Sequence, residues 1–409
     1  MKLSKIKMSC TLAVAGIAIS TTSLKAQIKL LPQYHIYSGN THSHTAFTRS
    51  HGAQFKHLPG FKKFLFIDSN SVGHSINTEL KPDWQKLQGP PSAHFAEAKA
   101  DGYDFYVTTD HSQEAGFNPP SPSSADWVAA HKEATAATNK NFVAISGYEH
   151  SENNGPVGKG HLNIINSASY LNALMPGVDI PYLYKWLDTV SSYGDGPVVA
   201  SFNHPGAHQY DDWAYRDPKV TDIITMLEVI NSNSHIHYQG FVNALDAGWK
   251  VSPVCGNDNH GLNGIKVQKS RTFVLAASKT KAAILDAMKN RRTYASLDNN
   301  IQCKYSVNGM VMGSTLNHPK TFRFKISISD PDTNDPTDKI TKIDIVKDSG
   351  KIVQTYTPTP GYSMEWNPVI KDADAKFFFI RVWNAGGGDA PRADADKPVA
   401  WLAPVWTGR

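Results

Sequence analysis

The segment from Ile36 to Gly52 reads IYSGNTHSHTAFTRSHG and places three histidines, His42, His44 and His51, within ten residues. Residues i and i+2 of an extended strand point to the same side, so the imidazoles of His42 and His44 can reach one cation. This spacing predicts a metal site. The competing interpretation is a solvated surface pair, because His-x-His sequences also occur by chance. Ligand-type residues at the ends of later apolar runs favour the metal site.

The length and the first 26 residues indicate the domain organisation. At 409 residues the chain exceeds one ordinary domain, and we expect two. Three lysines (Lys2, Lys5 and Lys7) precede an apolar run at 10–19, and small and polar residues follow up to Ala26. This pattern is typical of a secretory signal peptide and is too short to span a membrane. We therefore predict a signal peptide over 1–26 and a secreted or periplasmic protein.

The charge of the mature chain argues against a nucleic-acid partner. Removing residues 1–26 takes away four lysines and no acid, so the formal net charge falls from +5 to +1. No later apolar run is long enough to cross a bilayer, so we expect no membrane anchoring. Cys255 and Cys303 remain in the mature chain; they could form one disulfide, but two buried free thiols are the expectation. The oligomeric state stays open.

Strands and helices alternate from Ser92 onward. The predicted strands cover 103–109, 141–147, 197–202, 223–227, 249–255, 271–275 and 291–296, and the predicted helices cover 93–99, 124–139, 181–192, 238–248 and 281–290. The first five of these strands run into His, Asp, Glu or Asn. Such alternation predicts a parallel sheet, most simply closed into a barrel whose chemistry sits at the carboxyl ends of the strands.

Two further regions depart from this rhythm. Residues 53–93 form a long insertion rich in Gly, Pro, Asn and Ser, which we interpret as a lid over the site or as surface decoration. After about residue 300 the segments TFRFKISIS, KITKIDIV and KFFFIRVW alternate or cluster strand-forming residues between turn residues. We predict a small all-β sandwich over 301–409, with a structural role favoured over glycan binding.

Seven short motifs occur in a characteristic order. They are HSH at 42–44, TDH at 109–111, GYE at 147–149, GHLN at 160–163, NHP at 203–205, LEVIN at 227–231 and DNH at 258–260. In order and content they resemble the polymerase and histidinol phosphatase (PHP) superfamily. The resemblance implies an α/β fold, a distorted seven-stranded (β/α) TIM-like barrel over 27–300, with a multinuclear metal centre that usually hydrolyses phosphate esters. Some secreted members carry a similar β-sandwich after the barrel.

The resemblance also implies a ligand set for two or three divalent cations. The first cation would be held by His42, His44, Glu149 and Asp258, the second by Glu149 as a bridge with His161 and His204, and the third by His51, His111 and His260. His57 is the alternative to His51, because the spacing from His42 is longer than usual. The superfamily usually has an acid two residues before its first histidine, where this chain has Asn40.

The chemistry of these residue types agrees with the resemblance. Imidazole and carboxylate ligands suit Zn, Mn or Fe without selecting among them. Two cations about 3.5–4 Å apart lower the pKa of a shared water towards neutrality, which predicts a bridging hydroxide as nucleophile. A third cation would stabilise the phosphoryl oxygens. The hypothesis makes Glu149 the bridge, and Asp258 or a bound water the proton donor to the leaving group.

Other polar residues are assigned supporting or substrate roles. Asp110 is expected to orient a ligand, Glu228 and Asn231 to support the rim, and Asn40 and Asn163 to stand beside the ligands. Arg49, Lys159 and Arg292 are candidates for phosphate binding, since guanidinium and ammonium groups match its oxygens.

The sequence thus predicts a secreted metal-dependent hydrolase acting on a small-molecule phosphate ester, either a phosphomonoesterase or a phosphodiesterase. A carbamate, amide or carboxylic ester hydrolase on the same fold is the alternative enzyme. A non-catalytic metal- or glycan-binding protein is the alternative from another class.

Overall fold

The computed structural model describes residues 34–48, 88–117, 122–152, 159–173, 175–232, 235–387 and 397–409. The predicted signal peptide, most of the predicted 53–93 insertion, and His51, His57 and Arg49 lie outside these ranges. Residues Tyr34–Arg409 belong to one compact unit. Within the described residues, no helix combines the length and the apolar character that crossing a membrane requires.

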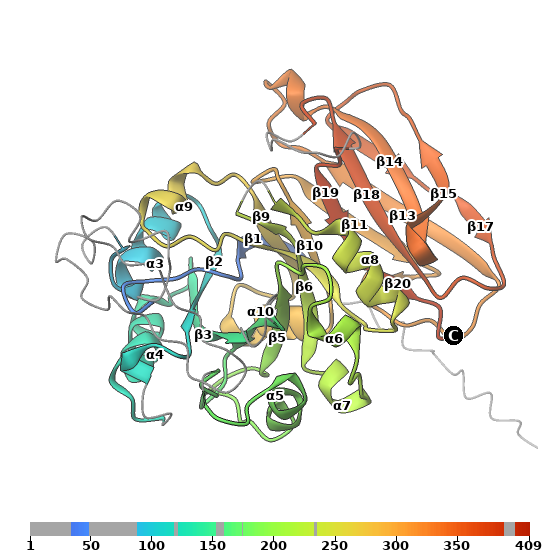
Figure 1. Cartoon of the computed structure of the whole chain (residues 1–409). Coiled ribbons are helices and arrows are strands. Elements are labelled where there is room, and N and C mark those ends of the chain that lie inside the picture. Colours follow the sequence, from blue (N-terminus) through green and yellow to red (C-terminus); the bar gives the residue numbers. More distant parts are fainter. Residues whose placement is uncertain are drawn as a thin grey trace, which may run out of the picture. The chain divides into compact units, whose positions relative to one another are not determined.

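The first part of the chain forms a mixed α/β structure around one large sheet (Figure 1). Its strands are β1 (His35–Asn40), β2 (Phe105–His111), β3 (Val143–Glu152), β4 (Gly160–Ile165), β5 (Val199–Asn203), β6 (Ile224–Asn231), β7 (His235–Ile236), β8 (Ser252–Gly256), β9 (Arg271–Ala276) and β10 (Thr293–Ser296). Its α-helices are α3 (Pro91–Ala100), α4 (Ala125–Ala137), α5 (Ile180–Leu187), α6 (Tyr210–Trp213), α7 (Pro218–Thr221), α8 (Tyr238–Asp246), α9 (Asn263–Val267) and α10 (Lys281–Lys289). β2, β5, β6 and β8 are buried along their whole length, as expected for strands covered on both faces.

The expectation of a parallel sheet is only partly correct. β1, β2 and β3 are parallel neighbours, and so are β5, β6 and β8. β4, however, runs antiparallel to both β3 and β5, and β9 runs antiparallel to β1 and β10. For β3 and β4 the reason is loop length: only a short segment separates them, and a short loop joins antiparallel strands, whereas a parallel crossover needs a dozen or more residues.

The predicted closed barrel is not confirmed by the strand pairing. The sheet runs β1-β2-β3-β4-β5-β6, with β8 paired to β6, and within the described ranges no ladder joins β8 to β1. Just beyond these two strands, a single parallel bridge links Ser43 to Asn259. The Thr41 and Thr272 hydroxyls also donate to the Cys255 carbonyl, at 3.1 and 2.9 Å.

The segment after residue 300 contributes strands to two sheets. The five-stranded sheet contains β11 (Gln302–Val307), β12 (Met310–Val311), β13 (Thr321–Ser329), β16 (Ser363–Trp366) and β17 (Val369–Lys371). The strands β14 (Ile340–Lys347), β15 (Lys351–Tyr356), β18 (Phe377–Asn384), β19 (Ala400–Leu402) and β20 (Val405–Trp406) extend the large sheet, because β19 pairs with β10. Burial alternates along β13, so one of its faces meets the core. The domain boundary at residue 300 stays a prediction.

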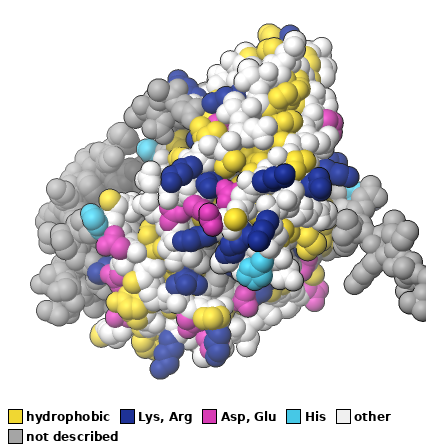
Figure 2. All heavy atoms as spheres, turned by 90° about the vertical axis from the view of Figure 1, so that its right-hand side faces the viewer, with side chains coloured by type: hydrophobic (Ala, Val, Ile, Leu, Met, Phe, Trp, Pro, Cys, Tyr) yellow, Lys and Arg dark blue, Asp and Glu magenta, His cyan; other side chains and the backbone are white. Residues whose placement is uncertain are grey.

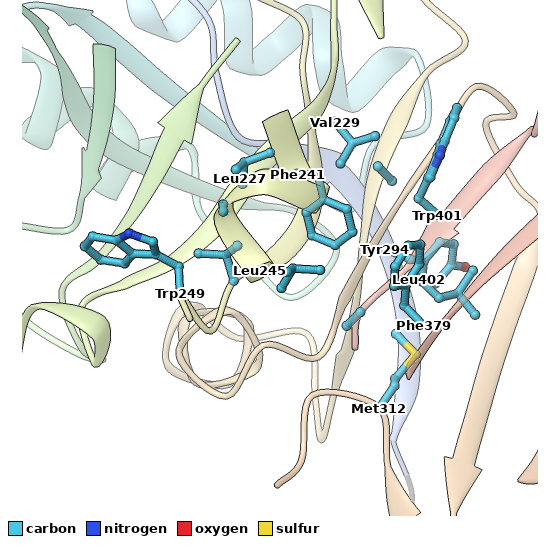
Figure 3. Close-up of a cluster of buried hydrophobic side chains, with 14 of the residues drawn as sticks. Leu227, Val229, Phe241, Leu245, Trp249, Tyr294, Met312, Phe379, Trp401 and Leu402 are labelled. Atoms are coloured by element: carbon cyan, nitrogen blue, oxygen red, sulfur yellow. The ribbon is translucent and has the colours of Figure 1, made fainter. Parts of the chain in front are cut away.

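One apolar core reaches from the first part of the chain into the second. Figure 3 shows Phe241 and Leu245 of α8 on one side and Phe379 and Trp401 of the C-terminal strands on the other. The rings of Phe241 and Phe379 lie 5.4 Å apart, edge to face. Cys255 and Cys303 are both free and buried, so the expectation of two thiols is confirmed.

The surface seen in Figure 2 carries Lys and Arg side chains interspersed with Asp and Glu. This mixture is in keeping with the small formal charge of the full chain, +5.

Candidate metal centre

Eight of the nine predicted ligands meet at one end of the sheet, and the ninth, His51, lies outside the described residues. His42 and His44 follow β1, His111 ends β2, Glu149 lies in β3, His204 follows β5, and Asp258 and His260 follow β8. His161 enters from the opposite direction, near the start of antiparallel β4, where it pairs in register with Ser151 of β3 and Asn203 of β5. Because β4 runs antiparallel to its neighbours, its first residues, including His161, lie at the carboxyl ends of β3 and β5.

The carboxylate of Glu149 lies among five imidazoles. Its oxygens are 3.0 Å from His111 Nε2, 3.1 Å from His161 Nδ1, 3.4 Å from His204 Nε2, 3.5 Å from His42 Nε2 and 3.6 Å from His44 Nε2. A cation bound at about 2.0–2.2 Å separates neighbouring ligand atoms by about 3.0–3.5 Å. The spacing around Glu149 is thus that of ligands around shared cations.

Hydrogen bonds fix which nitrogen of His42 faces the cluster. Glu228 Oε1 lies 2.7 Å from His42 Nδ1, and both side chains are buried. A carboxylate only accepts, so Nδ1 carries the proton and donates it to Glu228. The lone pair of His42 Nε2 is therefore directed towards the cluster, as metal-binding histidines require.

A second relay fixes His44. The Thr48 hydroxyl donates to Asp110 Oδ1 at 2.8 Å. The Thr48 hydroxyl oxygen also accepts from the His111 backbone N–H at 3.1 Å. Because the single hydroxyl hydrogen of Thr48 is donated to Asp110, the hydroxyl oxygen must be the acceptor in its 3.1 Å contact with His44. His44 Nδ1 therefore carries the hydrogen. Asp110 further accepts from the backbone N–H and hydroxyl of Thr45, at 2.7 and 2.9 Å. The predicted role of Asp110, to orient a ligand, thus operates through Thr48.

Acceptor atoms consequently converge on one point. His42 Nε2 and His44 Nε2 are 3.0 Å apart, and Asp258 Oδ1 lies 3.1 Å from His44 Nε2. Burial alone lowers the pKa of His42, but the carboxylates of Glu228, Asp258 and Glu149 outweigh it and raise that pKa well above its usual value. Burial lowers the pKa of His44 to about 3. When these imidazoles are neutral, their nitrogen lone pairs and the neighbouring carboxylates form a set of ligand atoms that a divalent cation can neutralise.

Two carboxylates supply that negative charge. Burial opposes ionisation of Glu149 and Asp258, but the surrounding imidazoles hold the pKa of both carboxyls well below the usual range. Imidazole nitrogen and carboxylate oxygen together suit Zn, Mn or Fe. The donor set thus fits the predicted cations.

Three groups of ligand atoms at this end of the sheet have the spacing of metal sites. They are His42–His44–Glu149, Glu149–His161–His204 and His44–His111–His260. The first two contain residues predicted for the first and second sites, with Asp258 beside the first. In the third, His44 stands where the prediction placed His51, and its ring stacks on that of His260 at 4.1 Å. Sequence spacing does not indicate that one histidine borders two sites.

Two ligands adopt left-handed backbone conformations. The φ angles are 29° at His204 and 48° at Asp258. Non-glycine residues adopt this region at a cost and are held there by surrounding contacts. The His204 N–H donates to Glu228 Oε2 at 2.8 Å, and the Asp258 N–H donates to the His42 carbonyl at 2.9 Å. Both strained residues are therefore tied to the parts of the chain that orient His42.

Glu228 and Asn231 were predicted to support the rim, but they directly contact residues that were predicted as ligands. The Asn231 amide donates to Glu228 Oε2 at 3.1 Å and to Asp258 Oδ2 at 3.3 Å. Glu228 is fully buried and contacts both His42 and the backbone of His204. These two residues position three ligands at once.

Asn40 and Asn163 make structural contacts next to the ligands. Asn40 donates to the His42 carbonyl at 2.8 Å and accepts from the Asn257 N–H at 2.9 Å, so an amide here makes both bonds where a carboxylate could only accept. The Asn163 amide donates to the Thr41 carbonyl at 3.2 Å. Both asparagines hold the strand end that carries His42.

Two of the predicted phosphate-binding cations are engaged elsewhere. Lys159 Nζ pairs with Asp211 at 2.7 Å. Arg292 pairs with Asp286 at 2.5 Å and donates to the Leu275 carbonyl, and Leu275 pairs with the start of β1, the end opposite His42. The structure therefore does not bring Arg292 to the cluster, and the prediction of phosphate binding by Arg292 is corrected. Arg49 lies outside the described residues.

Four contacting residues escaped the sequence analysis. Asn203 donates to Glu149 Oε1 at 3.0 Å and Ser151 donates to Glu149 Oε2 at 3.3 Å. Glu114 lies 3.5 Å from His111 Nδ1, and Thr48 forms the relay to His44. Only Asn203 had a usable signal, since it stands beside His204 in the NHP motif.

The comparisons with known proteins are sparse. The sequence matches no family model and no curated protein. One similar solved structure, from Bacteroides vulgatus, is described as a two-domain protein containing a predicted PHP-like metal-dependent phosphoesterase; it is 17% identical, with 91% of this chain and 96% of that chain covered and a TM-score of 0.44. Another is the lesion-specific endonuclease PfuEndoQ from Pyrococcus furiosus, 12% identical over 63% of this chain and 56% of that one, with a TM-score of 0.34.

Proposed function

We propose that this protein is a metal-dependent phosphoesterase of the PHP superfamily. The observation that carries the proposal is the carboxylate of Glu149 with five imidazole nitrogens within 3.6 Å of its oxygens. A structural histidine cluster would pair each ring with a donor or an acceptor of its own. Here the ordered tautomers of His42 and His44 instead leave lone pairs facing each other.

The residues that would hold the cations are those of the three groups, with Asp258 added to the first. When bound, divalent cations supply a water of lowered pKa and neutralise charge on phosphoryl oxygens. The chain's own contribution is to hold the ligands in place before substrate arrives. Glu228 and Asn231 orient His42 and Asp258, and the Asp110–Thr48 relay orients His44.

We further propose that β1, β2, β3, β4, β5, β6 and β8 make up the distorted seven-stranded barrel of the superfamily. The bridge between Ser43 and Asn259 and the bond from the Thr41 hydroxyl to the Cys255 carbonyl support closure between β8 and β1. A barrel closed at this place would have His42, His44 and Asp258 at its seam.

The substrate we propose is a small-molecule phosphate ester, and the cations Zn, Mn or Fe. The mature protein is proposed to be secreted or periplasmic, on the strength of the N-terminal sequence pattern. Its formal charge of +1 without residues 1–26 supports a small substrate over a polyanion.

A substrate panel tests the proposal. Protein purified without chelators is assayed against p-nitrophenyl phosphate, bis-p-nitrophenyl phosphate, naphthyl carbamates and naphthyl acetate. The metal content of each preparation is measured at the same time. Glu149→Gln keeps the shape of the side chain and removes its charge, and Glu365→Gln in exposed β16 is the matched control.

We expect hydrolysis of one of the phosphate esters, loss of that activity together with bound metal in Glu149→Gln, and no change in Glu365→Gln. Preferential hydrolysis of carbamates or acetates would identify the alternative enzyme. Metal without turnover on any substrate would favour a binding protein. Full activity in Glu149→Gln would refute the assignment of the bridge.

A further inference from the structure

A second group of carboxylates lies away from the histidines, where the two parts of the chain meet. Asp298 follows β10, Asp330 follows β13, and Asp338 ends the short 3-10 helix η2 (Pro336–Asp338) before β14. One carboxylate oxygen of each lies within 4.8 Å of the others. The three residues come from separate segments, on both sides of the predicted domain boundary.

Asp330 has an oxygen that lacks a partner. Its side chain is buried, with 3% of the residue exposed. Its Oδ1 accepts from the Asp332 N–H at 2.9 Å, but its Oδ2 is buried and has no hydrogen-bond partner within the described part of the chain. A buried carboxylate oxygen without a donor is costly, so a donor or a cation beyond the described residues is expected there.

A neighbouring amide shows the same deficit. Asn300 donates from Nδ2 to Asp332 Oδ2 at 2.9 Å, which fixes the orientation of the amide. Its Oδ1 is buried and has no partner among the described residues. Both orphaned atoms are acceptors, so what they lack is a hydrogen-bond donor or a cation.

The carboxylates also repel one another. Burial and then the charges of Asp298, Asp338 and Asp332 raise the pKa of Asp330 to about 7. Burial and the charges of Asp298, Asp335 and Asp332 raise the pKa of Asp338 to about 6. A divalent cation between them would replace this repulsion by attraction.

We propose that Asp298, Asp330 and Asp338 bind a Ca²⁺ ion that ties the C-terminal strands to the end of β10. The donors are oxygens only, without the imidazoles of the histidine centre, and hard oxygen ligands select Ca²⁺ over Zn²⁺. Carboxylate, amide and backbone oxygens and water complete calcium shells of six to eight ligands at about 2.3–2.6 Å. Asn300, whose backbone N–H donates to Asp298 Oδ1 at 2.8 Å, is a candidate to supply an amide oxygen.

Calcium titration of the full chain tests the site. Protein stripped with chelator and dialysed is titrated with CaCl₂ and, separately, MgCl₂ by calorimetry, and its thermal unfolding midpoint is measured in parallel. Asp330→Asn keeps the Oδ1 acceptor for the Asp332 N–H and removes the charge. Asp179→Asn is the matched control, because its Oδ1 also accepts a local backbone hydrogen bond, from the Tyr182 N–H, at the start of α5.

We expect the unmodified protein and Asp179→Asn to bind Ca²⁺ with a Kd of about 10⁻⁴–10⁻³ M and with a rise in the unfolding midpoint. In Asp330→Asn we expect a Kd at least tenfold higher and no rise. Asp298→Asn provides the same readout if Asp330→Asn does not fold. Ca²⁺ that reaches the histidine centre would act equally on all variants, so the difference between them reports on this site.

Two results would overturn the proposal. One is an unmodified protein that neither binds Ca²⁺ nor gains stability at about 10 mM Ca²⁺, a concentration well above the Kd of the weakest calcium-binding modules. The carboxyls would then hold protons instead of a cation. The other is binding in Asp330→Asn and Asp298→Asn that equals that of the unmodified protein.

Discussion

Replacing Glu228 by Gln tests whether the tautomer of His42 controls the metal centre. The carboxylate accepts from His42 Nδ1 at 2.7 Å on one oxygen, and from the His204 N–H at 2.8 Å and the Asn231 amide at 3.1 Å on the other. Glutamine has one oxygen for these two sides. If its amide nitrogen faces His42, the proton of that ring must move to Nε2, where the metal would bind. If the amide nitrogen faces the other way, the His204 N–H and the Asn231 amide both point at another donor and lose their acceptor.

The size of the effect follows from these contacts. Each buried donor left without an acceptor costs about 1–3 kcal/mol, and 1.4 kcal/mol is a factor of ten in an equilibrium constant. Only one side of the glutamine is mismatched at a time, so we expect metal affinity to fall about 10- to 100-fold, the range found when a residue that orients a ligand is removed. Hydrolytic activity at limiting metal should fall with it.

The assay is competition with a chromophoric chelator, with Zn²⁺ and Mn²⁺ titrated separately. Glu365→Gln is the control for loss of one carboxylate, because that side chain is exposed on β16. Thermal unfolding of the metal-free proteins shows that both variants are folded. Unchanged metal affinity in folded Glu228→Gln would refute the reasoning, since His42 would then choose its tautomer without Glu228.

Three further predictions concern the same network. A Cβ at Gly256 would overlap Glu228 Oε1, so Gly256→Ala should displace that carboxylate and lower metal affinity at least tenfold, measured by the same competition. Thr48→Val removes the hydroxyl that fixes His44 Nδ1, and we expect about tenfold weaker metal binding with a lower unfolding midpoint. The pKa of His42 is raised by the nearby carboxylates, so below that pKa a proton must leave before metal binds. Metal affinity should therefore increase with pH, by about tenfold per unit for each protonated ligand.

Each of these has a matched control or a contrary outcome. A Cβ at Gly206 meets only the side chain of Gln209 at 3.4 Å, so Gly206→Ala should bind metal normally. Thr355→Val removes a hydroxyl bond to Asp344 far along the chain in β15 and should leave metal affinity unchanged. Affinity that is flat between pH 5 and 8, a range of about three units in which imidazoles titrate, would contradict the proton competition.

The sequence indicated which residues meet at Glu149 better than it indicated their arrangement. His42, His44, Glu149 and Asp258 were identifiable because each stands in a short motif or at the end of a buried strand. The position of Glu228 was recognised, but not its contact with His42, which lies 186 residues away in the chain. Contacts between distant residues depend on how strands pair, and periodicity does not encode pairing.

The direction of the strands was the main gap in the predicted fold. Alternating helices and strands suggested parallel neighbours, but β4 contains polar residues at alternating positions and follows β3 after a short segment. Loop length carried the information that hydrophobic pattern did not. The continuation of the large sheet from β10 into β19 was likewise invisible, because those strands are separated by about a hundred residues.

The most direct test of the central claim is a crystal structure of protein loaded with Mn²⁺ or Zn²⁺, with anomalous scattering collected at the metal edge. We predict at least two anomalous peaks, each within about 2.0–2.3 Å of an oxygen of Glu149. One should lie at the Nε2 atoms of His42 and His44, and the other at His161 Nδ1 and His204 Nε2. An anomalous map without peaks at Glu149, from protein that is saturated with metal, would contradict the account.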